Sequence, residues 1–231
     1  MVGIIGAMAL EVERVRALLQ QRKCVAVGCT EFYTGKLHGV DAVVADCGVG
    51  KVNAALCAQA MLLQFKPKLI LNIGVAGGLS PGMKIGDIAI ATSVVQHDFN
   101  TAVLGNPRGF IFNLKRVNIP CDEKTIQMLL KAAGKLKDIQ AHTGVIATGD
   151  QFISSQETKE ELVQEFGAIA CEMEGAAVGQ VCALHGVPFG VVRAISDGAD
   201  DGSPADFITF AKQAADRSAA LLLNFMREVN A

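Results

Sequence analysis

The sequence has almost balanced charge and no long apolar run, and both shortages exclude classes of protein. It contains 21 Lys and Arg against 23 Asp and Glu, a net charge of −2. Such a balance offers no strongly basic surface for nucleic acid or an anionic membrane. No uninterrupted apolar run reaches the roughly 18 residues that a membrane-spanning helix needs. Residues 1–6 have no basic flank and Glu11 follows soon after, so we expect a strand there and not a signal peptide.

The cysteines and histidines lack the spacings that disulfides and metals require. The seven cysteines include no C-x-x-C pair, and an odd number fits poorly with a disulfide framework. We therefore expect a reduced, cytoplasmic environment. The four histidines form no H-E-x-x-H or related pattern, so no metal is expected. His97 and Asp98 are adjacent, but a single pair of this kind is more often incidental.

Familiar glycine-rich motifs are also missing. Residues 48–51, Gly-Val-Gly-Lys, lack the first glycine of a phosphate loop, and Val52 stands where Ser or Thr would bind magnesium. No G-x-G-x-x-G follows the first predicted strand. Residues 74–78, Gly-Val-Ala-Gly-Gly, could form either a tight turn or a backbone that a ligand approaches closely.

Apolar periodicity predicts alternating strands and helices. Predicted strands cover residues 2–5, 69–73, 87–95, 144–147, 168–171 and 189–194, and residues 25–47 predict two or three antiparallel strands. Predicted helices cover residues 10–21, 52–65, 122–136, 154–167, 175–185 and a last helix from 203. The second helix would bury Val52, Leu56, Ala60 and Leu63, and Ser154 with Glu157 resembles a capping box. Residues 97–117 predict a long functional loop.

This alternation indicates βαβ units, and hence a mainly parallel sheet with an antiparallel addition at residues 25–47. We find no repeat and no linker. The prediction is one three-layer α/β domain over residues 1–231.

Acidic residues stand where apolar runs end. Glu172 and Glu174 follow one predicted strand, Asp197 follows another, and Glu11 opens the first helix. Each alone has an ordinary explanation, such as a favourable charge at a helix N-terminus. Because the carboxyl ends of strands converge on a ligand crevice, the group instead indicates acid–base chemistry on a polyol or a base. Of Glu172 and Glu174, one alone could face the pocket.

Six motifs, in this order, resemble the bacterial 5′-methylthioadenosine/S-adenosylhomocysteine nucleosidases. They are residues 3–8 with Glu11, then 48–52, 72–78, 148–153, 172–175 and 193–197. The resemblance runs nearly from Met1 to the last helix. It implies a nucleoside phosphorylase-like fold, a single three-layer α/β/α domain around a mixed, barrel-like central sheet. It also implies a homodimer with an apolar pocket for the 5′-thio substituent near the interface.

The resemblance implies roles for the carboxylates in hydrolysing an N-glycosidic bond. Asp197 would be the general acid that protonates adenine at N7. Glu174 would accept hydrogen bonds from the ribose hydroxyls and stabilise positive charge on the sugar. Glu11 would activate the attacking water, and Arg193 would hold that carboxylate and water in place.

The same resemblance implies a set of substrate-binding residues and no cofactor. Met173 would pack on the ribose, Phe152 would stack on adenine, and the backbone of Ile153 would read the edge of the base. The remaining residues expected to contact substrate are Met8, Gly77, Ser196 and Phe207, the last closing the thioalkyl pocket.

The implied reaction releases adenine and a thioribose, and other functions stay open. A phosphorylase of the same superfamily would need cationic donors for phosphate, whereas the turns after Gly6 and Gly74 contain no arginine. A futalosine hydrolase is a further alternative. A non-catalytic nucleoside-binding protein would be expected to have lost a catalytic carboxylate. The preference among methylthioadenosine, S-adenosylhomocysteine, 5′-deoxyadenosine and futalosine stays open.

Overall fold

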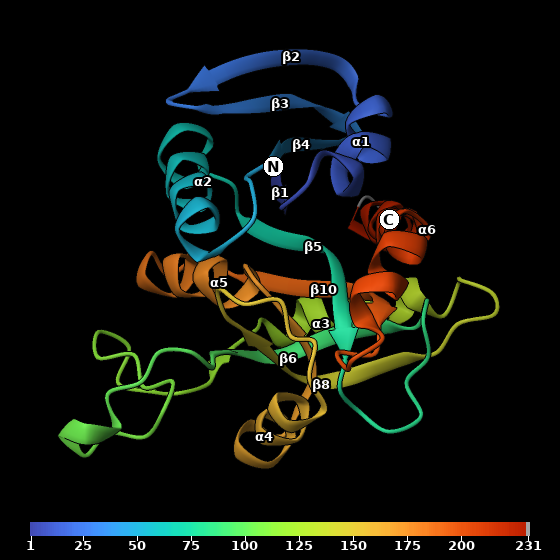
Figure 1. Ribbon diagram of the computed structural model, residues 1–231. Helices are drawn as coiled ribbons and strands as arrows, with labels where there is room; N and C mark the ends of the chain where they lie inside the picture. Colours follow the sequence, from blue (N-terminus) through green and yellow to red (C-terminus); the bar gives the residue numbers. More distant parts are fainter. Residues whose placement is uncertain (230–231) are drawn as a thin grey trace.

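A computed structural model describes residues 1–229 and contains one mixed sheet of ten strands flanked by helices (Figure 1). The strands are β1 (Val2–Gly6), β2 (Gln20–Val27), β3 (Thr30–Leu37), β4 (Val40–Asp46), β5 (Leu69–Gly78), β6 (Ile88–Gln96), β7 (Ile119–Pro120), β8 (Ala141–Thr148), β9 (Ala168–Glu172) and β10 (Phe189–Asp197). The helices are α1 (Ala9–Ala17), α2 (Lys51–Phe65), α3 (Glu123–Ala133), α4 (Gln156–Phe166), α5 (Gly175–Leu184) and α6 (Ser203–Val229), with a 3₁₀ turn at Ala102–Leu104.

Half of the sheet closes on itself. Strands β10, β6, β8, β9 and β5 pair in that order, and β5 pairs again with β10. Strands β1, β4, β3 and β2 extend this ring from the other edge of β5. The expected mixed, barrel-like sheet is therefore confirmed.

The sheet is mainly parallel outside β2, β3 and β4, as predicted, but it also contains antiparallel pairs that were not predicted. Antiparallel pairs occur in the ring itself, between β6 and β10 and between β5 and β9. Strand β6 follows β5 through residues 79–87, which contain no helix. Parallel strands need a long crossover, so a short loop reverses the chain and makes β6 run against β5 and β10.

The glycine-rich residues 74–78 continue β5 and form no turn. Gly74 is paired with Arg193 of β10, and Gly77 with Cys171 of β9. Partners on both edges supply hydrogen bonds and packing that outweigh the weak strand preference of glycine. Strand β10 likewise runs beyond its predicted end, as far as Asp197. These extensions bring both strands to the pocket described below.

Helix α2 buries a different face from the one predicted. Val52, Leu56 and Leu63 are 70%, 60% and 63% exposed. The buried residues are Ala54, Cys57, Ala58, Met61 and Leu62. Helix α2 contacts α5, β1 and β4, and its buried face combines small residues with the larger Met61 and Leu62.

Other boundaries moved by a few residues. The first helix ends at Ala17, because Gln20 already belongs to β2. Ser155, not Ser154, caps α4 by accepting a hydrogen bond from the N–H of Thr158 at 3.3 Å. The predicted long loop at 97–117 contains only the 3₁₀ turn and extends away from the sheet (Figure 1).

The helices lie on two sides of the sheet. Helices α2 and α5 contact each other on one side, and α6 contacts α1 and α3 on the other (Figure 1). Helix α6 also crosses β5 and β10. Within residues 1–229 no helix combines the length and apolarity needed to cross a membrane.

Candidate active site

A cavity of about 150 Å³ opens where β1, β4, β8, β9 and β10 end, beside the second half of β5. Most of its wall is apolar, and three elements contribute carboxylates. It is lined by Ala7, Met8, Glu11, Val49, Val75, Ala76, Gly77, Gln151, Phe152, Ile153, Cys171, Glu172, Met173, Glu174, Ser196, Asp197 and Phe207.

The cavity brings together every predicted site residue except Arg193, which is buried behind the carboxylates. The lining residues that were not predicted are Ala7, Val49, Val75, Ala76, Gln151 and Cys171. All but Cys171 lie inside the six motifs, and Cys171 directly precedes Glu172. A wider reading of each motif, including its apolar members, would have found them.

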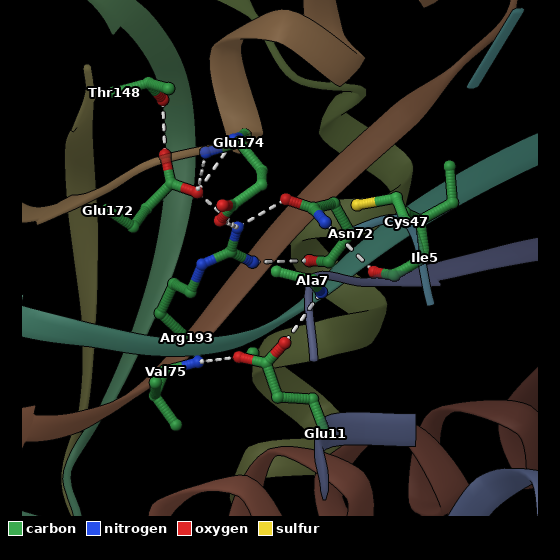
Figure 2. Close-up of polar contacts among 12 residues, drawn as sticks. Ile5, Ala7, Glu11, Cys47, Asn72, Val75, Thr148, Glu172, Glu174 and Arg193 are labelled. Atoms are coloured by element: carbon green, nitrogen blue, oxygen red, sulfur yellow. Dashed lines mark hydrogen bonds and ion pairs between the residues drawn. The ribbon is translucent and has the colours of Figure 1, made fainter. Parts of the chain in front are cut away.

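Glu11 is almost fully buried and is held entirely by backbone donors. Oε2 accepts the N–H groups of Ala7 at 2.7 Å and Met8 at 2.8 Å, and Oε1 accepts the N–H of Val75 at 3.0 Å (Figure 2). Burial raises the pKa of Glu11, while the positive charge of Arg193 and these hydrogen bonds act in the opposite direction. The result is a fixed carboxylate with a raised proton affinity.

Two glycines leave the space that this carboxylate fills. A Cβ at Gly74 would lie 2.4 Å from Oε1 of Glu11, and one at Gly6 would lie 3.4 Å from Oε2. Gly77 has the same relation to the other end of the site, where a Cβ would lie 3.0 Å from Oδ1 of Asp197. The glycines of β5 therefore leave room for Glu11 and Asp197, as well as forming the wall.

Arg193 serves Glu172 and not Glu11. Its guanidinium donates to Oε2 of Glu172, to the side chain of Asn72, and to the carbonyl of Asn72 at 3.1 Å (Figure 2). Within residues 1–229 it makes no hydrogen bond to Glu11, so the contact expected from the resemblance is absent and only the longer-range charge effect remains.

Glu172 is fully engaged by the protein. Its Oε1 accepts the hydroxyl of Thr148, and Oε2 accepts the N–H groups of Glu174 at 3.1 Å and Gly175 at 2.7 Å, besides Arg193. Thr148 and Asn72 were not singled out individually, although both belong to motifs. Their contacts hold Glu172 at the cavity wall and Arg193 behind it.

Glu174 has fewer partners. Oε1 accepts the N–H of Gly50 at 2.8 Å, and Oε2 lies 3.9 Å from the guanidinium of Arg193. Burial, together with the negative charge of Glu172, raises the pKa of Glu174 to about 7, against the opposing effects of Arg193 and the Gly50 hydrogen bond. Both Glu172 and Glu174 reach the cavity, so the expectation that only one of them would was too narrow.

Asp197 stands at the opposite side of the cavity, at the end of β10. Its Oδ2 accepts the hydroxyl of Ser196 at 2.8 Å, and Oδ1 accepts the N–H of Ala199 at 3.0 Å. It is 2% exposed. The hydroxyl of Ser196 thus orients the carboxyl group, and Gly77 leaves room for it.

Aromatic and sulfur-containing side chains form the apolar part. Phe152 and Phe207 meet edge to face with ring centroids 5.6 Å apart. Phe152 is 46% exposed, so its ring is open to a partner. Met8 and Met173 line the same cavity. Such a wall fits a flat ring and an alkyl group better than a phosphate.

His97 and Asp98 do not form a dyad. Asp98 bonds to Lys51 and to the N–H of Asp150, while neither ring nitrogen of the buried His97 has a partner within residues 1–229. Burial lowers the pKa of His97. The described part of the chain also contains no cluster of three or more His, Cys, Asp or Glu side chains able to hold a metal.

Comparison with known proteins identifies the class to which this fold and pocket belong. The sequence model of a family described as the Phosphorylase superfamily matches residues 1–227. The nucleosidase named 5′-methylthioadenosine/S-adenosylhomocysteine nucleosidase from Geobacillus thermodenitrificans is 39% identical over 228 residues, 98% of this chain and 96% of the relative. The chain belongs to the phosphorylase superfamily and, within it, to the family of these nucleosidases.

Solved structures agree over the whole fold. The nucleosidase of Neisseria meningitidis in complex with methylthio-immucillin-A gives a TM-score of 0.95 at 34% identity and 98% coverage of both chains. A native structure of the futalosine hydrolase of Helicobacter pylori gives a TM-score of 0.93 at 37% identity, covering 98% of this chain and 97% of that one.

Proposed function

We propose that the chain is an N-glycosyl hydrolase that cleaves 5′-methylthioadenosine and S-adenosylhomocysteine into adenine and the corresponding thioribose. The observation that carries this proposal is the set of buried carboxylates, Glu11, Glu174 and Asp197, on separate elements around one apolar cavity. Relatives that share the whole chain length are named for these two substrates.

Asp197 is the general acid of the proposed mechanism. It protonates N7 of adenine, which turns the base into a better leaving group. The hydrogen bonds from Ser196 and the N–H of Ala199 fix the carboxyl group at the cavity wall. A positioned acid of this kind contributes about 10²- to 10⁴-fold to the rate.

Glu174 stabilises the sugar as its bond to adenine breaks. One oxygen is held by the N–H of Gly50, and Oε2 has no hydrogen bond within residues 1–229. That oxygen can accept the ribose hydroxyls and face the positive charge that develops on the ring.

Glu11 activates the attacking water. Its three backbone hydrogen bonds hold both oxygens at the cavity wall. Its raised proton affinity, caused first by burial, suits a group that takes a proton from water. Arg193 acts in this scheme through Glu172 and Glu174, and not by holding the water beside Glu11.

The apolar wall suits the rest of the substrate. Phe152 stacks on adenine while the backbone of Ile153 reads its edge, Met173 packs on the ribose, and Met8 and Phe207 face the 5′-thioalkyl group. No cofactor enters this mechanism.

Phosphorolysis fits the site less well. A phosphate dianion needs several cationic donors. The cations beside the site are already paired, Arg193 with Glu172 and Lys51 with Asp98, and Glu11 would repel an anion at the position of the nucleophile. Water meets no such repulsion.

A futalosine hydrolase is a second candidate, because a protein with that name shares the fold at 37% identity. In that case Phe207 would face the 5′ substituent of futalosine, and its apolar ring suits a thioether better.

The first test measures adenine release from methylthioadenosine by chromatography. The reaction is run in phosphate-free buffer and again with added phosphate. We expect release without phosphate, together with free methylthioribose. Release only with phosphate would identify a phosphorylase. Release from futalosine alone would favour the second candidate, and binding without any release would indicate a non-catalytic protein.

We also propose that the whole chain forms one domain, that it works in the cytoplasm, and that it forms a homodimer. All seven cysteines have free thiols, which suits a reducing compartment.

Large apolar side chains are exposed on α2 (Val52, Leu56 and Leu63) and in the loop 97–117 (Val103 and Leu104). Helices α2 and α5 and this loop extend on the same side of the molecule (Figure 1).

The dimer has its own test. Leu56→Lys with Leu63→Lys places two charges on the exposed face of α2 without touching the core. We expect light scattering to give a dimeric mass for the native chain and a monomeric mass for this variant. A native monomer at micromolar concentration would contradict the proposal.

A further inference from the structure

Three residues beside the cavity form a closed ring of hydrogen bonds that no step of the proposed mechanism uses. Lys51 is the first residue of α2, Asp98 follows β6, and Asp150 follows β8. Nζ of Lys51 donates to Oδ1 of Asp98 at 2.6 Å, and the N–H of Asp150 donates to Oδ2 of Asp98 at 2.9 Å. The N–H of Lys51 donates to Oδ1 of Asp150 at 2.8 Å and closes the circuit, here called the Lys51 ring.

The ion pair of the ring is partly sheltered from water, whereas Asp150 is exposed. The side chains of Lys51 and Asp98 are each 17% exposed. Burial acts to raise the pKa of Asp98, but the hydrogen bonds from Lys51 and Asp150 outweigh it and hold that pKa below its usual value. Asp98 therefore stays ionised, and removing Lys51 would leave a sheltered carboxylate without its counter-charge.

One arm of the ring reaches Glu174. Gly50 directly precedes Lys51, has φ of 100° and donates its N–H to Oε1 of Glu174 at 2.8 Å. A Cβ at Gly50 would lie 3.1 Å from Oδ1 of Asp150. The position of the Gly50 N–H thus depends on how closely Asp150 is held against the start of α2.

The other arm reaches the base. Asp150 begins the segment 150–153, in which Phe152 and Ile153 line the cavity. Asp98 holds the backbone N–H of Asp150, so it fixes the start of this segment. The Lys51 ring consequently sets the distance between Glu174, the proposed ribose-binding carboxylate, and residues 150–153, the proposed adenine-binding segment.

We propose that Lys51 is a positioning residue: by binding Asp98 at the start of α2, it fixes the Gly50 N–H that holds Glu174 relative to the segment 150–153. Lys51 does not line the cavity, so it acts only through these neighbours. The inference rests on the proposed function, because it assigns Glu174 to the sugar and this segment to adenine.

A pH profile separates this role from a merely structural ion pair. The charged or titratable groups that act on Glu174 are Glu172 of β9, Arg193 of β10, Glu11 of α1 and Cys47 after β4. These stay in place when Lys51 is changed. Loss of the Gly50 hydrogen bond removes a contact that favours the ionised form, so the pKa of Glu174 rises. The acidic limb of kcat/KM then moves to higher pH.

The experiment compares Lys51→Met with Lys51→Arg and with Lys36→Met. Lys36 pairs with Asp41 at 2.8 Å on an exposed face, so Lys36→Met also removes one positive charge and one ion pair, but outside the cavity. For Lys51→Met we expect kcat/KM on methylthioadenosine to fall by about 100-fold, the effect of misplacing reacting groups by about 1 Å. We also expect the acidic limb to move upward, and Lys51→Arg to restore most of both properties.

Two outcomes overturn the inference. One is a Lys51→Met enzyme that matches Lys36→Met in kcat/KM and in the position of its acidic limb. The other is a loss of activity with an unmoved limb and no recovery in Lys51→Arg. If Lys51→Met fails to fold, Asp98→Asn is measured instead, with the same expected directions and the same refuting results. A native chain that releases no adenine refutes the proposed function instead, before any variant is compared.

Discussion

The substitution Gly74→Ala probes the water-activating end of the site without changing any reacting group. Gly74 lies in the middle of β5, and an added Cβ would lie 2.4 Å from Oε1 and 2.9 Å from Cδ of Glu11. Ordinary contacts of this kind are close to about 3.5 Å. The carboxylate must therefore move by about 1 Å, although the new methyl group adds no charge and removes no hydrogen-bonding group.

Glu11 cannot make this movement and keep its contacts. Its hydrogen bonds from Ala7, Met8 and Val75 measure 2.7, 2.8 and 3.0 Å. A shift of about 1 Å breaks at least one of them and misaligns the attacking water, which costs about 100-fold in kcat. That factor corresponds to about 2.7 kcal/mol of transition-state stabilisation. KM should change little, because Glu11 acts on water and not on the nucleoside.

The assay is steady-state adenine release, with Gly134→Ala as the matched control. A Cβ at Gly134 would have no neighbour closer than 3.6 Å, and its φ of −61° suits alanine. We expect the control to match the native enzyme. We also expect the double variant Glu11→Gln with Gly74→Ala to have nearly the same kcat as Glu11→Gln alone, because both changes impair the same carboxylate. A folded Gly74→Ala enzyme with kcat within twofold of native would refute the reasoning.

The other predictions concern the remaining two carboxylates. Asp197→Asn should reduce kcat by at least about 10²-fold. Its Kd for an adenine nucleoside, measured by calorimetry, should stay within a few-fold of the native value. Near-native turnover would show that Asp197 is not the general acid. The pKa of Glu174 is raised from 4.5 to about 7, so the folded state binds this proton more tightly, and stability is lost as pH rises through that window. At pH 8, Glu174→Gln should therefore have a higher Tm than the native chain, by roughly 2–4 °C for each kcal/mol of destabilisation that ionised Glu174 causes. The difference should be smaller at pH 5. An equal difference at both pH values would argue against a raised pKa of Glu174.

The strand-end carboxylates could be predicted from sequence because their placement is local. A polar residue that ends an apolar run must lie at the edge of the sheet, whichever strands are its neighbours. This is how Glu174 and Asp197 were recognised, and the cavity contains both. The presence of these carboxylates in one cavity was thus predictable from residue type and position along the chain.

Features that depend on partners far away in sequence could not be predicted in this way. Residues 74–78 form a strand because β9 and β10 pair with them. Helix α2 buries Ala54 and Ala58 and leaves Leu56 exposed, because the elements that it contacts, α5, β1 and β4, lie on that side. Arg193 contacts Glu172 because Asn72 and the end of β9 hold both groups, and no spacing along the chain records that choice.

Glu172 and Glu174 show how one short junction yields two different carboxylates. The oxygens of Glu172 accept a hydroxyl, two backbone N–H groups and a guanidinium, so no acceptor is left for a ligand. Glu174 receives one backbone N–H, and its second oxygen lies 3.9 Å from Arg193. A buried carboxylate with unused acceptors is costly for stability, and burial beside Glu172 raises its pKa to about 7. In the proposed mechanism the ribose hydroxyls supply the missing donors, so substrate binding would relieve a cost that the protein itself leaves uncompensated.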